Sequence, residues 1–193
     1  APVAAAPPPR SKVVSVVTTT SNATGLRPTD EASARVWDLA ATILDPEVPA
    51  LTIEDLGVLR EAHAEGKKAH VVLTPTYSGC PAMAHFESEI SAVLGQAGYA
   101  EVTVTTVLSP PWTTDDLSAA GRRKLAAYGI APPVGRAPAG PVNLSLAAHR
   151  PPEVACPRCG AVGRESARFG STACKALWRC KACREPCDYF KCH

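Results

Sequence analysis

The stretch Thr74–Met83 (TPTYSGCPAM) separates a predicted strand from a predicted helix and organises the chain around it. The run HVVL at residues 70–73 is short and apolar, which predicts a strand ending in turn residues. From Met83 onward, apolar residues recur at helical spacing, which predicts a helix with one buried face. Pro81 suits the first position of that helix, because its missing N–H group would have no partner there.

Cys80 therefore falls at or next to the N-cap of the predicted helix. Free backbone N–H groups and the positive end of the helix dipole favour a thiolate at such a place. Strand-to-helix turns are also common positions for ligands and chemistry in α/β proteins. The alternative is an unreactive buried thiol, since most free cysteines are small core residues. Position alone leaves both interpretations open.

The segments on either side predict an α+β fold with helices packed on a mixed sheet. A first helix is expected from Thr29 or Asp30 to Asp45, where Pro46 disfavours helical geometry. Strands are expected near residues 58–63, 69–74 and 101–107, and helices over 81–95 and 114–128. The order helix–strand–strand–helix–strand gives one small layered domain.

Composition sets limits on the classes of function. The chain has 193 residues, 46% hydrophobic residues and a net charge of +2, which fits a globular domain with a small appended module. The charge is too close to neutral to indicate nucleic acid, and no apolar run approaches the roughly 20 residues of a membrane helix. We expect a mobile tail over 1–28, an α/β domain over 29–150 and a cysteine-rich module over 151–193.

Seven of the eight cysteines lie in the last module, and four of them form two C-x-x-C pairs. These are Cys156 with Cys159 and Cys180 with Cys183. Zinc prefers four thiolates at the corners of a tetrahedron, and each two-residue spacer lets one tight turn supply two of them. The spacing predicts a structural zinc ribbon, with rubredoxin-like iron on the same thiolates as the rival. Metal-type cysteine pairs and the lack of a signal-peptide pattern at the N-terminus predict a cytoplasmic location.

Four further residues of the module could be ligands: Cys174, Cys187, Cys192 and His193. They fit a second metal site, a redox pair or ordinary packing thiols, and spacing does not decide between these. Loop 45–49 carries two more candidate groups, Asp45 and Glu47. Ordinary turn chemistry, with Asp45 as a cap and Glu47 in solvent, is the competing interpretation there.

Several motifs resemble known families. The first domain is similar to the MIP18 (DUF59) family in DPEVP at 45–49, IEDLG at 53–57 and PTYSGCP at 75–81. The last module is similar to the D proteins of bacterial phenylacetate degradation in FGSTACKAL at 169–177, REP at 184–186 and DYFKC at 188–192. The resemblance implies a small α/β domain associated with iron–sulfur cluster assembly, followed by a zinc ribbon.

The resemblance also implies a role. Such a protein would be an accessory factor that matures the multicomponent phenylacetyl-CoA epoxidase, handling iron or an iron–sulfur cluster transiently. Its clients would be the oxygenase or the iron–sulfur reductase component. Matching motifs make Cys80 the functional thiol, with Asp45 and Glu47 as its partners. A homodimer is also suggested by the resemblance, although the residues themselves give no support for it.

In the C-terminal module, the resemblance places Cys174 and Cys192 at matching positions beside the four zinc ligands. Relatives carry Phe in place of Cys187, so we discount that residue as a ligand, and His193 is an equally weak candidate.

Two other function classes remain at this stage. A thiol enzyme would pair Cys80 with His85, one turn along the helix, and a structural component of the epoxidase would need neither. A nucleic-acid-binding ribbon would need its aromatic residues exposed for base stacking, whereas a small ribbon usually buries them. These residues are Trp178, Tyr189 and Phe190.

Overall fold

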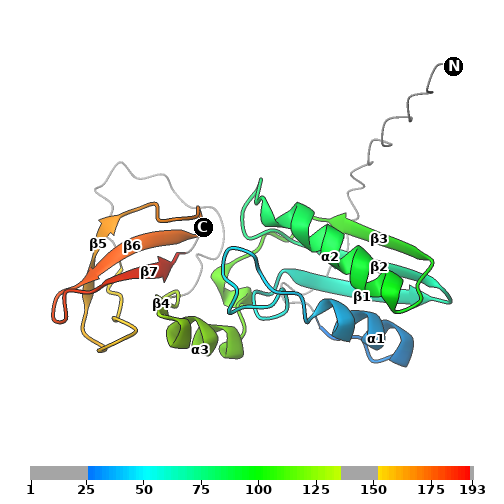
Figure 1. Ribbon diagram of the computed structural model, residues 1–193, viewed down its shortest axis with the longest axis horizontal. Coiled ribbons are helices and arrows are strands. Elements are labelled where there is room, and N and C mark those ends of the chain that lie inside the picture. Colours follow the sequence, from blue (N-terminus) through cyan, green and yellow to red (C-terminus); the bar gives the residue numbers. More distant parts are fainter. Residues whose placement is uncertain (1–25, 136–151, 192–193) are drawn as a thin grey trace, which may run out of the picture.

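The computed structural model describes residues 26–135 and 152–191. The first unit contains α1 (Glu31–Ala40), β1 (Leu59–Glu65), β2 (Lys68–Leu73), α2 (Ala82–Gln96) and β3 (Glu101–Thr106). The 3-10 helix η1 (Thr114–Asp116) and α3 (Ala119–Tyr128) follow. The second unit contains β4 (Ile130–Ala131), β5 (Gly163–Ala167), β6 (Lys175–Cys180) and β7 (Pro186–Phe190). The two sheets lie at opposite ends of an elongated molecule, with α3 below their junction (Figure 1). Within the described ranges, no helix combines the length and the apolar character that a bilayer crossing requires.

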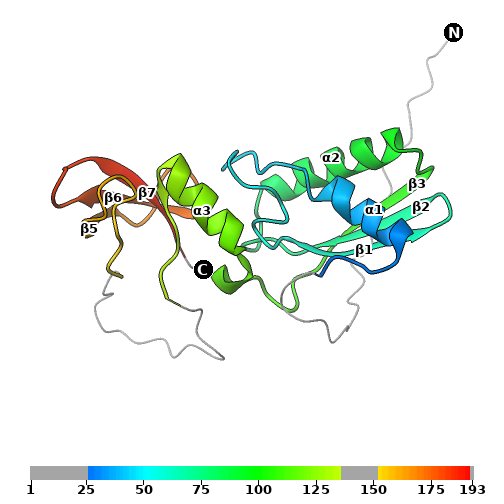
Figure 2. The same ribbon diagram turned by 90° about the horizontal axis from the view of Figure 1, so that it is seen from below.

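The first sheet has the strand order β1-β2-β3. β1 and β2 pair antiparallel, whereas β2 and β3 pair parallel, so the sheet is mixed. α1 packs on β1, α2 packs on β3, and the two helices also contact each other (Figure 2). The predicted α+β domain, with helices packed on a mixed sheet, is therefore confirmed.

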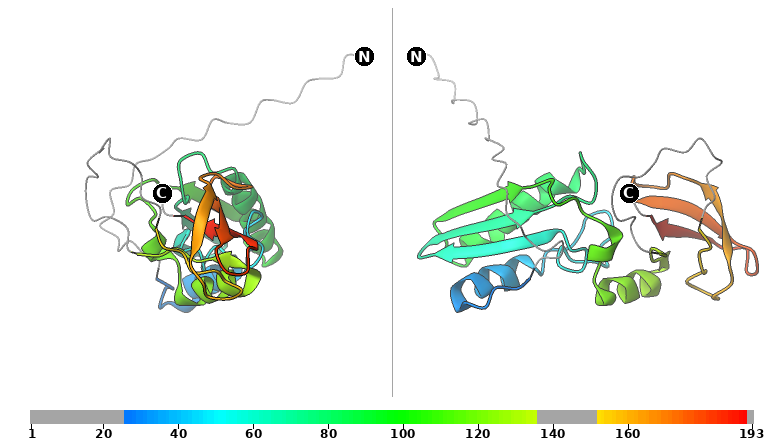
Figure 3. Two further views of the ribbon diagram at one scale, coloured as in Figure 1. Left: turned by 90° about the vertical axis from the view of Figure 1, so that its left-hand side faces the viewer. Right: turned by 180° about the vertical axis from the view of Figure 1, so that it is seen from behind.

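The second sheet has the order β4-β7-β6-β5. β5, β6 and β7 form an antiparallel ribbon, and β4 adds to β7 in parallel, with Ile130 opposite Asp188. β4 directly follows α3 in the sequence, so a segment from well before residue 151 completes the C-terminal sheet (Figure 3). The predicted boundary at 150/151 falls next to the undescribed range 136–151, and the predicted tail falls mostly within 1–25, which is also outside the described residues.

One hydrophobic core extends through both units. Trp37 of α1, Phe86 of α2 and Leu125 of α3 belong to the same buried cluster as Cys174 and Phe190 of the ribbon. A second, smaller cluster lies inside the ribbon and contains Trp178, Cys187 and Tyr189. The ring of Trp112 meets that of Phe190 edge-on, with 6.3 Å between the ring centroids. Because this contact is apolar and buried, it fixes the ribbon against the α/β unit.

The first helix is shorter than predicted. It begins at the Asp30 cap, whose carboxylate accepts from the backbone N–H of Ser33, but it ends at Ala40 instead of Asp45. Beyond it, the N–H of Asp45 donates to Leu51 and the carbonyl of Ile43 accepts from Ile53, each over 2.9 Å. These backbone groups pair across the loop and are therefore not available to a helix.

The predicted helix over 114–128 is also divided, into η1 and α3. Ser118 separates them, because its backbone N–H donates to the carbonyl of Asp55 and its hydroxyl caps a new helix at Gly121. Thr114 is thus the start of a single 3-10 turn only.

Candidate functional site

The four cysteines of the C-x-x-C pairs meet in the ribbon. Their sulfur atoms all lie within 4.8 Å of one another. Cys156 and Cys183 are 3.8 Å apart at sulfur, and Cys159 and Cys180 are 3.5 Å apart. A tetrahedral metal with metal–sulfur bonds of about 2.3 Å places its sulfur ligands roughly 3.8 Å apart, so the donor set fits zinc. All four positions are thiols of the protein, which is typical of a structural site.

Each knuckle ends in a residue with left-handed backbone. In the first knuckle, Gly160 has φ +75° and donates from its N–H to the carbonyl of Cys156 over 2.9 Å. In the second, Arg184 occupies the equivalent place with φ +63°. Its carbonyl accepts a hydrogen bond of 3.0 Å from Nε of Arg179. This bond helps to hold a conformation that costs a non-glycine residue about 1–2 kcal/mol.

Cys80 lies directly before Pro81, the N-cap of α2, and is partly exposed. The turn that delivers it contains Gly79 with φ +85° and a hydrogen bond from the N–H of Cys80 to the carbonyl of Tyr77. The backbone N–H of Ala82 hydrogen-bonds the thiol, as expected for the start of a helix. Even so, the prediction of a favoured thiolate is wrong for the protein without its cargo. Burial first, and then the nearby carboxylates of loop 45–49, raise the pKa of Cys80 above its usual value.

Asp45 acts as a cap in its loop. Its Oδ1 accepts hydrogen bonds of 2.7 Å from the backbone N–H groups of both Glu47 and Val48, and the residue is only 8% exposed. Burial raises the pKa of Asp45 despite these bonds. The interpretation of Asp45 as a turn residue thus describes its contacts well, and these contacts position Glu47.

Glu47 faces the ribbon and is not simply solvated. Its Oε2 lies 3.5 Å from the sulfur of Cys174, which donates to it. Cys174 is 5% exposed, and its sulfur also lies 3.0 Å from the hydroxyl of Thr172. Burial, followed by the charge and hydrogen bond of Glu47, raises the pKa of Cys174 to about 11, although the Thr172 hydroxyl opposes this. A thiol of the ribbon therefore contacts a carboxylate of the α/β unit.

Sequence reasoning assigned Cys174 to the C-terminal module and missed this contact with loop 45–49. The available signal was that Cys174 lies outside both C-x-x-C pairs, but nothing in the spacing indicates where its side chain goes. The structure does not bring it to Cys187, which lies in the separate core of the ribbon. Cys192 and His193 fall outside the described residues.

A surface pocket of about 440 Å³ opens beside Glu47 at the junction of the two units. Tyr128, Ile130, Lys175 and Asp188 are among the residues that line it. The loop that carries Glu47 is thus reached from solvent between the α/β unit and the ribbon.

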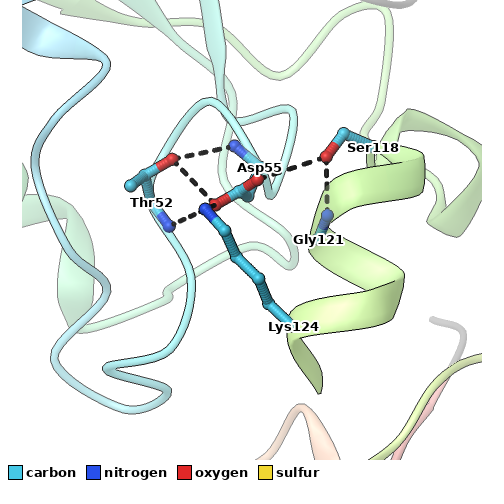
Figure 4. Close-up of polar contacts among 5 residues, drawn as sticks. All are labelled: Thr52, Asp55, Ser118, Gly121 and Lys124. Atoms are coloured by element: carbon cyan, nitrogen blue, oxygen red, sulfur yellow. Dashed lines mark hydrogen bonds and ion pairs between the residues drawn. The ribbon is translucent and has the colours of Figure 1, made fainter. Parts of the chain in front are cut away.

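A polar network fixes α3 to the motif IEDLG (Figure 4). The carboxylate of Asp55 accepts from the backbone and the hydroxyl of Thr52, both over 3.1 Å, and from the hydroxyl of Ser118 over 3.3 Å. Lys124 forms an ion pair with the same carboxylate. Because α3 leads straight into β4, this network also helps to place the ribbon.

The residues of the two alternative functions lie elsewhere. His85 is exposed, and its ring lies 6.2 Å from that of Phe86. Trp178, Tyr189 and Phe190 are all buried and form the core of the ribbon, so they offer no platform for stacked bases.

Comparison with known proteins matches each unit to a family. A family model described as iron-sulfur cluster assembly protein matches residues 33–107, and one described as PaaD zinc beta ribbon domain matches 142–191. A crystal structure of a DUF59 domain of unknown function from Bacillus anthracis is 25% identical, with a TM-score of 0.45, over 48% of this chain and 90% of that one. The solution structure of Rv1466 from Mycobacterium tuberculosis, a protein associated with Fe–S complex assembly and repair, is 22% identical with a TM-score of 0.30. It covers 54% of this chain and 97% of that one.

A curated relative covers both units. It is a protein of Escherichia coli (strain K12) whose name makes it a candidate D component among the subunits of 1,2-phenylacetyl-CoA epoxidase. It is 48% identical over 158 residues, which are 81% of this chain and 91% of the relative. Together with the two family models, this match shows that the chain belongs to the family of the phenylacetyl-CoA epoxidase D proteins, in which an iron–sulfur assembly domain carries a zinc β-ribbon.

Proposed function

We propose that this protein is an accessory factor that supplies iron, as the ion or as an iron–sulfur cluster, to a multicomponent phenylacetyl-CoA epoxidase. The carrying observation is a thiol at a strand-to-helix turn, Cys80, within electrostatic reach of the carboxylates of Glu47 and Asp45. The match of residues 33–107 to an iron–sulfur assembly family and the name of the relative support the client class.

Each residue has a distinct part in this proposal. Cys80 is the ligand that takes up the cargo, and its proton passes to water when iron binds, since thiolate is the form that ligates. Glu47 supplies a carboxylate, which iron also accepts as a ligand. Asp45 is a positioning residue, because its carboxylate is occupied by the N–H groups that shape the loop of Glu47.

Cys156, Cys159, Cys180 and Cys183 would hold a structural zinc ion that stabilises the ribbon. Rubredoxin-like iron fits the same four thiols. All seven cysteines in the described part of the chain are free of disulfides. This supports a reducing, cytoplasmic site of action. The homodimer suggested by the resemblance stays a prediction, to be measured by light scattering.

The client is the oxygenase or the iron–sulfur reductase component, and one experiment distinguishes the candidates. The epoxidase components are co-expressed with the wild-type chain, without it, with Cys80→Ser, or with Cys187→Ser as the matched control. Iron per purified component is then measured. We expect low iron in one component without the chain and with Cys80→Ser, and full iron with the control. Full client iron with Cys80→Ser would contradict the role of Cys80.

A second candidate is a resident component of the complex, which the relative's name as an epoxidase subunit favours. In that case the client holds full iron without this chain, while activity requires a stoichiometric complex containing it. The same preparations test this by activity and by the composition of the purified complex.

A further inference from the structure

Cys174 belongs to the ribbon in sequence and to the α/β unit in its contacts. It directly precedes β6 but is buried in the core shared with the first unit. Its sulfur lies 3.5 Å from Oε2 of Glu47, the carboxylate that also acts on Cys80. A buried thiol aimed at a carboxylate of the cargo-handling loop is not needed by the zinc site, which already has four thiols.

Tyr77 connects the two thiols from the other side. Its hydroxyl hydrogen-bonds the thiol of Cys80, and the charges of Glu47 and Cys174 act on the same hydroxyl. Four side chains from three separate segments therefore converge: Tyr77 and Cys80 before α2, Glu47 in loop 45–49, and Cys174 before β6. Two of the four are thiols and one is a carboxylate.

The juxtaposition is held by contacts that surround it. Next to Cys174, the buried Lys175 donates from Nζ to the backbone carbonyl of Glu47 over 3.2 Å. The edge-on contact of Trp112 with Phe190 lies in the same core. The ribbon is thus fixed where it can contribute a ligand to the α/β unit.

We propose that Cys174 is the second thiolate ligand of the iron cargo, so that the cargo binds between the ribbon and the α/β unit. This rests on the proposed function and deepens it, because the ribbon becomes part of the cargo site and not only a structural appendage. Iron would be held by the sulfurs of Cys80 and Cys174 and by the carboxylate of Glu47, and both thiols would release their protons to water.

The spacing fits a carrier better than a resident metal site. In residues 26–135 and 152–191, only the four zinc-type cysteines form a group of three or more such ligands with all atoms within 4.8 Å. Cys80, Glu47 and Cys174 are therefore spread more widely and must close in on the metal. The closing movement costs binding energy, and a carrier that must release its cargo needs such a weaker site.

The test uses the full, zinc-loaded chain under anaerobic conditions, with ferrous iron alone or ferrous iron with sulfide as the probe. Iron and zinc per chain are measured after equilibrium dialysis, and X-ray absorption counts the sulfur atoms bound to iron. Four proteins are compared: wild type, Cys80→Ser, Cys174→Ser and Cys187→Ser. Cys187 is the matched control, because it is also a buried ribbon thiol but lies in the other core.

We expect two protein sulfur ligands to iron in the wild type and the control, and one in Cys174→Ser. Affinity for iron should fall at least ~10-fold in Cys174→Ser while the zinc content stays unchanged. Cys174→Ala, which places no hydroxyl in the apolar core, repeats the test if the serine variant loses its zinc. The two probe arms show whether the cargo is the ion or the cluster.

Iron binding by Cys174→Ser and Cys174→Ala with wild-type affinity and sulfur count would overturn the inference. If Cys80→Ser alone then loses iron, the proposed function stands without the ribbon thiol. A wild-type protein that binds neither probe would overturn both.

Discussion

Nζ of Lys175 lies 3.2 Å from the backbone carbonyl oxygen of Glu47 and joins the first residue of β6 to loop 45–49. Lys175 is only 7% exposed, and the carboxylate of Asp188 is the nearest counter-charge, 4.0 Å away. A lysine amine that is buried in this way needs such partners, because an unpaired buried charge is costly. This bond keeps Cys174 and Glu47 next to each other.

Replacing Lys175 by Met should therefore loosen the junction between the two units. Loss of a hydrogen bond from a charged donor predicts a decrease of about 1.5–3 kcal/mol in the free energy of unfolding. Urea unfolding followed by tryptophan fluorescence measures it, since Trp112 lies at this junction. Lys181→Met is the control, because Lys181 is exposed and should change stability by less than about 0.5 kcal/mol. Equal effects of the two substitutions would contradict the role given to Lys175.

The network around Asp55 predicts a specific pH dependence. Burial by itself would raise the pKa of Asp55, but the hydrogen bond and charge of Lys124, together with the bonds from Thr52, lower it below its usual value. A carboxyl whose pKa is lowered by folding stabilises the fold above its unfolded pKa of about 3.9. That contribution is lost as the pH falls through the folded pKa.

Asp55→Asn should accordingly lower the free energy of unfolding by about 1–3 kcal/mol at pH 7, and this difference from wild type should shrink below about pH 4. Urea unfolding of both proteins between pH 3 and pH 7 measures the difference, from which any zinc release common to both cancels. Asp115→Asn is the control, since Asp115 is exposed. A difference that stays constant down to the lowest pH would show that the charge of Asp55 has no part in it.

Gly57 is predicted to tolerate no side chain. Its φ is +68°, and a Cβ placed there would lie 2.3 Å from the backbone oxygen of Asp116. Gly66 has a similar φ of +58° but open space around it. Gly66→Ala should therefore cost about 1–2 kcal/mol for left-handed backbone alone, and Gly57→Ala clearly more. Thermal unfolding of the two variants compares them, and similar melting temperatures would refute the predicted clash.

Removal of the metal should unfold the ribbon first. We expect one zinc per chain, lost in Cys159→Ser and retained in Cys187→Ser, as measured by elemental analysis. After chelation, hydrogen exchange should accelerate by orders of magnitude in β5, β6 and β7, while β1, β2 and β3 keep most of their protection. Unchanged exchange in β6 after complete zinc loss would show that the metal does not stabilise the ribbon.

Local patterns predicted the elements of the fold well. Alternation and helical spacing indicated the strands β1–β3 and the helix that starts after Cys80, because these signals depend on which face of an element is buried. The end of α1 was misplaced, since the loop pairing of Ile43 with Ile53 is a tertiary effect that no local signal reports. The division of the third helix at Ser118 has the same cause, a bond to Asp55.

The candidate sites were predictable to different extents. The zinc-type thiols are evident from their spacing, because two residues between cysteines are a requirement of knuckle geometry. The contact of Cys174 with Glu47 joins residues 127 positions apart and depends on how two units pack, so spacing cannot reveal it. The raised pKa of Cys80 was missed for the same reason: the helix amide was foreseeable, whereas burial and the facing carboxylates were not.

The short strand β4 makes inheritance and folding follow different boundaries. The ribbon family begins at residue 142 in this chain, yet its sheet is completed by residues 130–131 on β7. A fragment starting at 142 would leave the β7 edge unpaired, and unpaired strand edges promote aggregation. Cleavage between residues 135 and 152, by contrast, should leave two pieces that stay bound to each other. A chimera that exchanges ribbons between relatives must therefore bring α3 and β4 along with the cysteines.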